Sequence, residues 1–341
     1  MNHKNDGKLP LITIGVVNYN SGEKLAKCIE AINKNTNYEF ELIIVDNNSN
    51  DLSLNTLREL ESTPSRNIFV IRNSSNFGPA KACNQIIKKA RGEYVAILAA
   101  DTIPSNNWLH NALEIFKNDK RLAIVQCKLI HKETNLIDSV GDFLGNFGFL
   151  VHIVEPCKER DYGQYDNIKY IFSIKSAASI LRRDIVLKLN GFDEDYFIFY
   201  EETDLCWRAW LMGYHVALAP RSVVYHSWGS SVSRSPIKSY LIYYHGTKNH
   251  LTTLLKNCET RSLIILFPLA VFVWLTIGFS LSFRRRSLDA IYVLNGIAWT
   301  LKNIKKIIPK RKIIQSRSKG LPRFLIRRMS LIRFFRMLKE Y

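Results

Sequence analysis

The sequence lacks paired cysteines and an N-terminal apolar segment, and each absence excludes a class of protein. The six cysteines are scattered and none forms a C-x-x-C pair, which argues against a zinc cluster and against a disulfide framework. A reducing compartment is therefore expected. Residues 1–10, MNHKNDGKLP, lack the apolar core of a signal peptide, so we expect the body of the protein to stay in the cytoplasm.

Positive charge is abundant, and it is concentrated at one end of the chain. The formal net charge is +18, and residues 284–341 carry +15 of it, with 17 lysines and arginines against two acids. The preceding residues carry only +3. The 341 residues are 47% hydrophobic and can bury one large core or two smaller ones. The sequence predicts a nearly neutral globular body followed by a strongly basic tail.

A long apolar segment precedes the basic one. Leu263–Phe283 contains no charged residue over 21 positions and is bracketed by Arg261 and by Arg284–Arg286. A membrane-spanning helix needs about 20 apolar residues, so this segment could cross a bilayer. Pro268 and Gly278 interrupt it, however.

The side of the membrane on which the flanking segments lie indicates whether this segment crosses the bilayer. The next apolar segment, 290–301, is too short to cross alone, and a single crossing would separate the body from the basic tail. We therefore favour a re-entrant or interfacial helical pair over residues 261–303. The basic tail, 304–341, would contact anionic lipid. A nucleic-acid-binding arm is the alternative, which the adjacent apolar segment disfavours.

The first 130 residues alternate between two patterns. Apolar β-rich segments are separated by segments with helical periodicity and helix-capping signals. Strands that are apolar on both faces, with helices between them, predict an α/β fold with a Rossmann-like, mainly parallel sheet flanked by helices. By contrast, GDFLGNFGF (141–149) is interpreted as a loop. The predicted strands are 11–19, 40–48, 67–73, 93–100 and 122–130, and the predicted helices are 21–35, 54–62, 79–92 and 104–119.

Polar residues follow the predicted strands at their carboxyl ends. Asn18 and Asn20 follow the first strand, Asp46 follows the second, Asn76 the third and Asp101 the fourth. In sheets of this kind ligands bind beyond the carboxyl ends of the strands. We therefore predict one binding site along this rim.

Several segments, taken in order, resemble family 2 glycosyltransferases, of the rhamnosyltransferase-like branch of surface polysaccharide synthesis. The resemblance covers roughly residues 10–260 and implies a GT-A domain over residues 1–260, with membrane-associated helices after it. It also implies a nucleoside-diphosphate sugar donor, a divalent metal, and inverting transfer to a hydroxyl of a lipid-linked glycan. The matching segments include VVNYN (16–20), IIVDNNSND (43–51), NFGPAKACNQ (76–85), GEYVAILAADTIP (92–104), GFDEDYFIFYEETDLCWRAWLMGY (191–214) and VVYHSWGSS (223–231).

The resemblance assigns a donor site along the rim. The Asp46 carboxylate could accept a hydrogen bond from N3–H of uracil or thymine, which leaves UDP and dTDP equally open. Asn76 and Gly78 precede a helix whose N-terminus would favour phosphate. The alternative for both segments is ordinary turn and cap chemistry. The predicted donor-binding residues are Asn18, Asn20, Asp46, Asn76, Gly78, Asn84 and Asp101.

Asp101 stands where the family has the last acid of its metal motif, but residues 99 and 100 are alanines. Magnesium commonly takes only one or two protein carboxylates and completes its shell with phosphate and water. His226 is the expected second ligand, and imidazole suits Mn²⁺ better than Mg²⁺. The alternatives are a solvated aspartate and an ordinary hydrogen-bonded histidine.

An inverting displacement needs a base that takes the proton of the acceptor hydroxyl. The family usually has Glu-Asp at the start of a helix, and here the pair is Glu201-Glu202. Glu202 therefore takes the position of the base, with Glu201 beside it and Asp204 as a further candidate. The alternative is that these acids only favour the positive end of the helix dipole.

A second function class stays open at this point. The reduced metal motif would also suit a non-catalytic, membrane-bound protein of the same fold that binds nucleotide sugars or assists assembly. In either case the expected location is the cytoplasmic face of the cell membrane.

Overall fold

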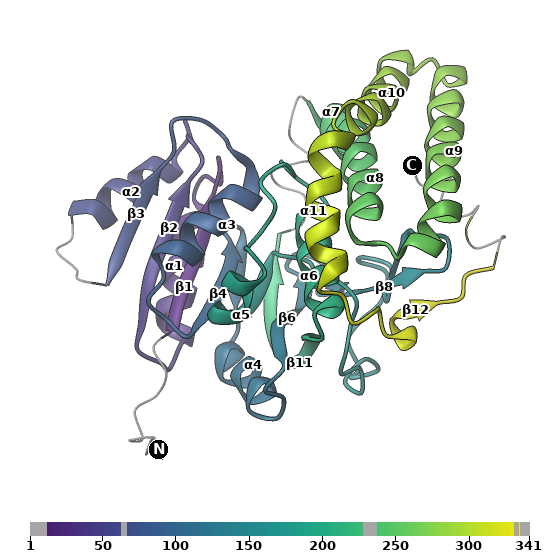
Figure 1. Cartoon of the computed structure of the whole chain (residues 1–341). Coiled ribbons are helices and arrows are strands. Elements are labelled where there is room, and N and C mark those ends of the chain that lie inside the picture. Colours follow the sequence, from purple (N-terminus) through teal and green to yellow (C-terminus); the bar gives the residue numbers. More distant parts are fainter. Residues whose placement is uncertain (1–11, 63–66, 228–236, 331–333, 335–341) are drawn as a thin grey trace.

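The computed structural model describes residues 12–62, 67–227, 237–330 and 334. A large sheet with helices around it occupies one side of the molecule, and a group of C-terminal helices occupies the other (Figure 1). The sheet contains β1 (Ile12–Asn18), β2 (Phe40–Asp46), β3 (Ile68–Arg72), β4 (Tyr94–Ala99), β5 (Thr102–Pro104), β6 (Leu122–His131), β7 (Ile137–Ser139), β10 (Ala178–Arg182) and β11 (His215–His226).

The strand order, β3-β2-β1-β4-β10-β6-β11-β5 with β7 beside β6, confirms the predicted α/β class. The first four strands are parallel, as expected, but β10 runs antiparallel between β4 and β6. Neighbouring residues of β2 point to two different cores, because Ile43 and Ile44 belong to separate apolar clusters. Both faces of the sheet are therefore covered.

The helices of the first part lie close to their predicted positions. Most of them bury one apolar stripe, as the periodicity of the sequence requires, whereas the last is buried on nearly all sides. They are α1 (Lys24–Asn35), α2 (Ser53–Ser62), α3 (Gly78–Lys89), α4 (Trp108–Lys117), α5 (Arg183–Lys188) and α6 (Glu201–Leu211).

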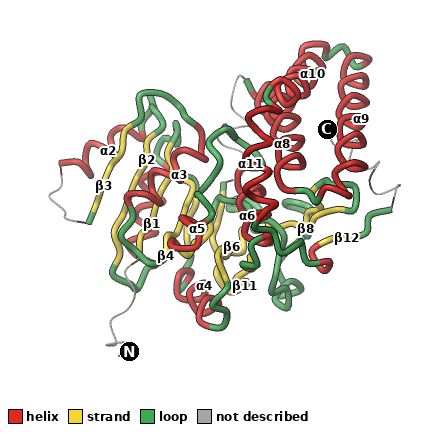
Figure 2. Tube along the Cα trace, viewed as in Figure 1, coloured by secondary structure: helices red, strands yellow, loops and turns green. Residues whose placement is uncertain are grey.

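The prediction of a loop over 141–149 is wrong. β8 (Asp142–Gly145) and β9 (Leu150–His152) form an antiparallel hairpin here, and β12 (Ile326–Arg327) adds a third strand to it (Figure 2). Phe143 and Phe149 are buried in the core, so the aromatic residues that made this segment look irregular are packing residues. The hairpin brings the C-terminal part of the chain to the edge of the site described below.

The C-terminal segment folds back on the body. α8 (Gly246–Asn257) is buried along its whole length. It follows α7 (Lys238–Tyr240) and the π-helical turn η1 (Leu241–His245), and it packs against α9 (Thr260–Phe283), α10 (Ser287–Lys302) and α11 (Ile304–Ser316). The turn η2 (Arg323–Leu325) leads into β12. The N-terminal decapeptide and most of the last eleven residues lie outside the described part.

Candidate active site

The predicted rim exists, and the pairing of the strands creates it. β1 and β2 are in register such that Asn18 pairs with Asp46, and β2 and β3 pair Asp46 with Arg72. The side chains meet as well, because Asn18 Nδ2 donates to Asp46 Oδ1 at 2.7 Å. The polar residues after separate strands therefore form one edge.

Asp46 is buried, and most of its carboxylate is already engaged. Oδ1 accepts from Asn18 and from Ser49 Oγ, the latter at 2.5 Å, and Oδ2 accepts from the Ser49 backbone at 3.2 Å. A carboxylate offers about four acceptor positions, which leaves capacity for one more donor. Contact with a nucleobase stays a prediction. The observed bonds show that Asp46 shapes the loop from which such a contact would be made.

Asn20 closes the same loop from the other strand. It has a left-handed backbone (φ 47°), its N–H donates to Ser49 Oγ at 2.9 Å, and its Oδ1 accepts from the Asn50 backbone at 2.9 Å. Its side chain is exposed at the rim. This position is open to a ligand in a way that Asp46 is not.

Asn76 and Gly78 start α3. Asn76 Oδ1 accepts from the Gly78 N–H at 2.9 Å, and Gly78 O accepts from Asn47 Nδ2 at 3.2 Å, which ties the helix to the end of β2. Gly78 has φ +80°, and a Cβ there would stand 2.2 Å from the Phe197 carbonyl oxygen. The glycine is thus required by a close approach of the protein's own backbone, and phosphate binding at this helix start stays a prediction.

Asn84 holds a loop in place. Its Nδ2 donates to Phe192 O and to Glu194 Oε1, both at 2.9 Å, and its Oδ1 accepts from the Phe192 N–H at 2.8 Å. The backbone of Gly191 (φ +63°) lies so close to that oxygen that a Cβ at this position would collide with it. Both amide protons are used inside the protein, so the structure assigns Asn84 to this loop in place of the predicted donor contact.

Asp101 and His226 come together, as the metal prediction requires. β5 pairs antiparallel with β11 so that His226 lies opposite Thr102, the neighbour of Asp101. His226 Nε2 lies 3.5 Å from Asp101 Oδ1, and its Nδ1 donates to Asp138 Oδ2 at 2.8 Å. Burial lowers the pKa of His226, but the two carboxylates outweigh it and raise the pKa to about 9.

This pair fits a divalent metal. Two ligands of one octahedral cation, each about 2.1 Å from it, lie roughly 3 Å apart, close to the observed separation. Asp138 fixes the imidazole through Nδ1, the usual support of a metal-binding histidine. Among the described residues, however, no group of three or more His, Cys, Asp or Glu side chains could hold a metal. Asp101 and His226 would therefore share the ion with a ligand's phosphates and with water.

Asp138 and Lys175 are site residues that the sequence analysis missed. Lys175 Nζ donates to Asp138 Oδ1 at 3.4 Å, and the Lys175 backbone N–H donates to Gln126 Oε1 at 2.7 Å. Burial and the cations His226 and Lys175 act on Asp138 in opposite directions, and the pKa of this carboxyl is lowered. Neither residue belongs to a segment from which the sequence predicted a site residue, so nothing in the sequence singled them out.

Glu201 and Glu202 form a buried acid pair at the start of α6. Burial, and then the neighbouring Glu202, raise the pKa of Glu201 well above its ordinary value. Burial also raises the pKa of Glu202, to about 7, with Asp142 raising it further and Lys175 lowering it. Oε2 of each has no hydrogen-bond partner in the described part of the chain. Glu202 is partly exposed and Glu201 is not, which suits Glu202 to the role of base.

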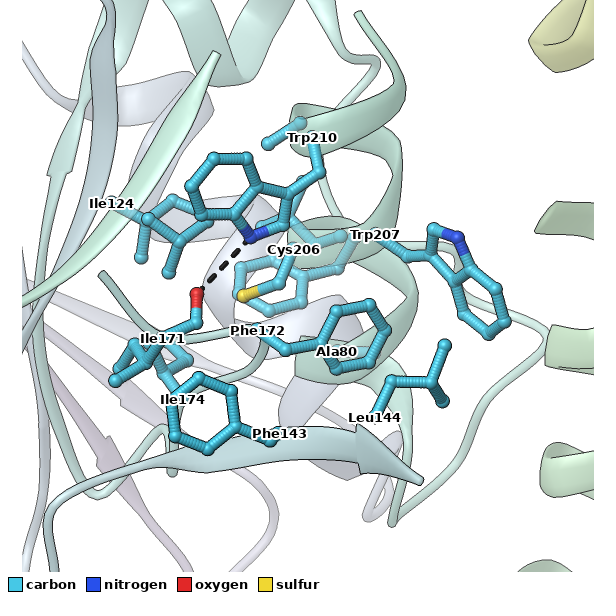
Figure 3. Close-up of a cluster of buried hydrophobic side chains, with 14 of the residues drawn as sticks. Ala80, Ile124, Phe143, Leu144, Ile171, Phe172, Ile174, Cys206, Trp207 and Trp210 are labelled. Carbon is cyan, nitrogen blue, oxygen red and sulfur yellow. Dashed lines mark hydrogen bonds between the residues drawn. The ribbon is translucent and has the colours of Figure 1, made fainter. Parts of the chain in front are cut away.

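Aromatic packing fixes the helix that carries this pair. Trp207 and Trp210 lie in the core beside Phe172, and Trp210 Nε1 donates to the Ile171 carbonyl at 3.1 Å (Figure 3). Both tryptophans are thus packing residues. They anchor the later turns of α6, so that its first turn has a defined position.

The turn before α6 is strained and is held from α8. Phe199 and Tyr200 have φ of 68° and 67°, a conformation that costs non-glycine residues about 1–3 kcal/mol each. Asn249 Nδ2 donates to the carbonyls of Ile198 and Phe199, both at 2.8 Å. One buried amide thus pins the turn that orients Glu201 and Glu202.

Asp204 does not fit the role of base. Its Oδ2 accepts from Arg208 Nε at 2.9 Å, and its Oδ1 accepts from Asn257 Nδ2 at 2.9 Å and lies 2.7 Å from Lys256 Nζ. The cations outweigh the effect of burial and lower its pKa. A carboxylate with both oxygens occupied and a depressed pKa cannot take a proton at neutral pH. We therefore correct this candidate to a structural residue that joins α6 to α8.

The fold and the rim define a GT-A glycosyltransferase. Residues 13–187 match the family described as "Glycosyl transferase family 2", and the chain belongs to that family. It is 32% identical to the O-antigen chain rhamnosyltransferase WbaN of Salmonella anatum, over 64% of this chain and 67% of that protein. It is 27% identical to the amylovoran biosynthesis glycosyltransferase AmsB of Erwinia amylovora, over 69% and 76% respectively.

A solved structure agrees with this fold. The mannosyltransferase PcManGT from Pyrobaculum calidifontis, in complex with GDP-Man and Mn²⁺, superposes with a TM-score of 0.54 at 16% identity. The match covers 86% of this chain and 88% of that one. At this identity the likeness establishes the architecture alone.

Proposed function

We propose that this glycosyltransferase moves one sugar, with inversion, from a UDP- or dTDP-linked donor to a hydroxyl of a lipid-linked surface glycan. The observation that carries the proposal is a connected charged array. Asp101 and His226, a pair suited to a metal, are joined through Asp138 to Lys175, and Lys175 acts electrostatically on Glu202. Such an array can stabilise the charge of a diphosphate leaving group, and it can hold a base that takes the proton of the acceptor.

The residues divide the work as follows. A Mn²⁺ or Mg²⁺ ion held by Asp101 and His226 would neutralise the charge of the diphosphate. Glu202 takes the proton of the acceptor hydroxyl, and its raised pKa suits that task at neutral pH. Burial and the neighbouring Glu202 raise the pKa of Glu201 well above its ordinary value, which favours loss of the first proton of the pair from Glu202.

The acceptor class is supported by the relatives. WbaN is named for O-antigen chains and AmsB for amylovoran, and both names describe polysaccharide synthesis. We further propose that the reaction takes place at the cytoplasmic face of the cell membrane, where the catalytic body would meet cytoplasmic nucleotide sugar.

The test is sugar transfer into a lipid extract of the host cell. Purified protein is incubated with UDP- and dTDP-linked radiolabelled sugars and Mn²⁺, and the organic phase is counted. We expect label from one donor, an inverted anomeric centre by NMR, and transfer by Glu202→Gln that is reduced by about 10²–10⁴-fold. Tight nucleotide binding without transfer from any donor would contradict the proposal and favour a non-catalytic role.

A further inference from the structure

The helix α9 has the length and composition of a membrane-spanning helix, yet it is bound to the protein along one side. It has 24 residues, and an 18-residue stretch of it has a mean hydropathy of 2.4; no other helix in the described part of the chain is both long and apolar enough to cross a membrane. Its buried residues recur at helical spacing and form one stripe. They are Ala270, Val273, Trp274, Ile277, Gly278 and Leu281.

That stripe makes specific contacts with α8 and α10. Trp274 Nε1 donates to Nδ1 of His250 in α8 at 3.0 Å, and His250 Nε2 is 2.9 Å from the Gly148 carbonyl oxygen of the body. Gly278 faces Val293 of α10 closely enough that an added Cβ would stand 3.6 Å from its side chain. The helix is therefore part of a packed unit.

α8 cannot enter a bilayer with α9. Its Lys256 Nζ lies 2.5 Å from Asp193 and 2.7 Å from Asp204, and both side chains of the latter pair are buried in the body. Lys248 Nζ donates to the Asp195 carbonyl at 2.8 Å. A crossing by α9 would have to abandon its contacts with α8 or draw these charges into hydrocarbon, where charge is costly.

The opposite side of α9 is apolar and exposed. Figure 1 shows α9 at the outer edge of the helical group, with α8 between it and α11. The exposed fractions reach 75% at Phe283 and 67% at Phe279. We call this surface, together with Leu288, Ile291 and Leu294 of α10, the hairpin face, after the helical hairpin that α9 and α10 form. Its members on α9 are Ile264, Ile265, Phe272, Leu275, Phe279 and Phe283.

The exposed charges around the hairpin face are mostly positive, with Glu259 before the first residue of α9 as an exposed acid. Arg261 at the start of α9 and Arg284 and Arg285 at the turn are exposed. The one acid in residues 260–302, Asp289, is buried and accepts from Arg286 Nε at 2.6 Å. An apolar stripe with a cationic border matches the acyl boundary and the headgroups of an anionic bilayer.

We propose that the hairpin face docks this protein in the plane of an anionic membrane, with α9 and α10 lying in the interface and not crossing it. This arrangement explains why α9, although long enough to span a membrane, keeps one side packed and hydrogen-bonded against the rest of the protein. The proposal does not depend on sugar transfer, so binding and activity can fail independently.

The test uses the full chain and two kinds of vesicle, phosphatidylcholine alone and phosphatidylcholine with phosphatidylglycerol. We expect co-sedimentation with the anionic vesicles and a loss of at least about tenfold in affinity for Phe272→Ser/Phe279→Ser. Leu52→Ser is the matched control, because Leu52 is an equally exposed leucine (62%) on the body. Arg284→Gln/Arg285→Gln should weaken binding to anionic vesicles and leave the fold intact.

A second measurement separates docking from spanning. Ser287→Cys places a thiol at the turn between α9 and α10, and a membrane-impermeant thiol reagent is added outside vesicles that carry the protein, with the wild type as background. Labelling from outside supports the in-plane arrangement, and protection in the lumen would overturn it. Equal vesicle binding by the Phe272→Ser/Phe279→Ser variant would also overturn the proposal. So would light scattering that shows a wild-type dimer which this double substitution converts to monomers, because the face would then be an interface between two copies of the chain.

Discussion

Single carboxylates behave in opposite ways here, and their surroundings explain the difference. Asp204 lies between cations and has a lowered pKa, whereas Glu202, two residues earlier, is only partly exposed, pairs with no cation among the described residues, and has a raised pKa. The sequence placed both in one helix turn and could not separate them. The difference in pKa comes from Arg208, one turn later in α6, and from α8, whose Lys256 and Asn257 reach Asp204.

The protonation of Glu202 should control the rate. Burial raises its pKa to about 7, so activity should rise with pH through neutrality as the carboxylate forms. Glu202→Gln should lose about 10²–10⁴-fold in kcat, the usual contribution of a general base. Initial rates across the neutral range test this. A pH-independent wild type, or an active glutamine variant, would contradict the assignment.

The neighbouring Glu201 should cost stability as pH rises. Its folded-state pKa is raised above the unfolded value, so above the unfolded pKa the native state holds a proton that the unfolded chain has lost. Stability therefore falls with increasing pH. Glu201→Gln should be more stable than wild type, with a gap that widens from acidic to alkaline pH in urea unfolding. Glu30→Gln, on an exposed position of α1, should show no widening gap.

At the scale of residues, much of the rim could be predicted from the sequence, but the residues that support the rim from behind could not. Asn18, Asp46 and Asp101 end strands, and the register of a parallel sheet brings such residues together. Asp138 contacts His226 and Lys175 contacts Asp138 only through long-range folding, so nothing local in the sequence indicates that they support His226. Likewise, no local signal shows that the amide of Asn84 is used by the loop at Phe192.

At the scale of elements, the strands and helices that alternate regularly were predictable, and the later insertions were not. β1 to α4 follow the apolar periodicity within a few residues. β10 inserts antiparallel between β4 and β6, and the β8–β9 hairpin depends on β12 from the far end of the chain. Such long-range pairing leaves no trace in a local window.

The element α8 should control the catalytic turn through one amide. Asn249→Leu removes the donor to the Ile198 and Phe199 carbonyls, which costs about 1–3 kcal/mol for each group left unpaired. We expect a roughly tenfold lower kcat with an unchanged KM for the donor. Thr252→Val is the control on the same helix, since the buried Thr252 hydroxyl has no partner among the described residues. Equal kinetics in both variants would contradict the positioning role.

The ion pairs between α8, α11 and the body should differ in strength according to burial. Lys256 is 2% exposed and Lys306 is 54% exposed, although both reach the same acidic loop. Lys256→Met removes a buried cation from Asp193 and Asp204, which keep Lys310 and Arg208 respectively, and should cost about 1.5–3 kcal/mol in denaturant unfolding. Lys306→Met should cost about 0–1 kcal/mol. Similar losses in both variants would show that burial does not set the strength of these pairs.

At the scale of the whole molecule, the basic segment is part of the packing of the body. Part of its charge is neutralised within the protein, because Lys306 and Lys310 pair with Asp195 and Asp193. α11 also donates from Arg311 and Gln315 to carbonyls at the end of α8. Removal of residues 304–341 should therefore destabilise the transferase domain itself.

The central claim is that Asp101 and His226 hold a metal for a nucleoside diphosphate beside an independent base, Glu202. Thermal unfolding with UDP and with dTDP, each with and without Mn²⁺, tests it most directly. We predict stabilisation by one nucleotide that requires Mn²⁺, is lost in Asp101→Asn and in His226→Ala, and persists in Glu202→Gln. Stabilisation that is the same without Mn²⁺, or that survives in Asp101→Asn, would contradict the account.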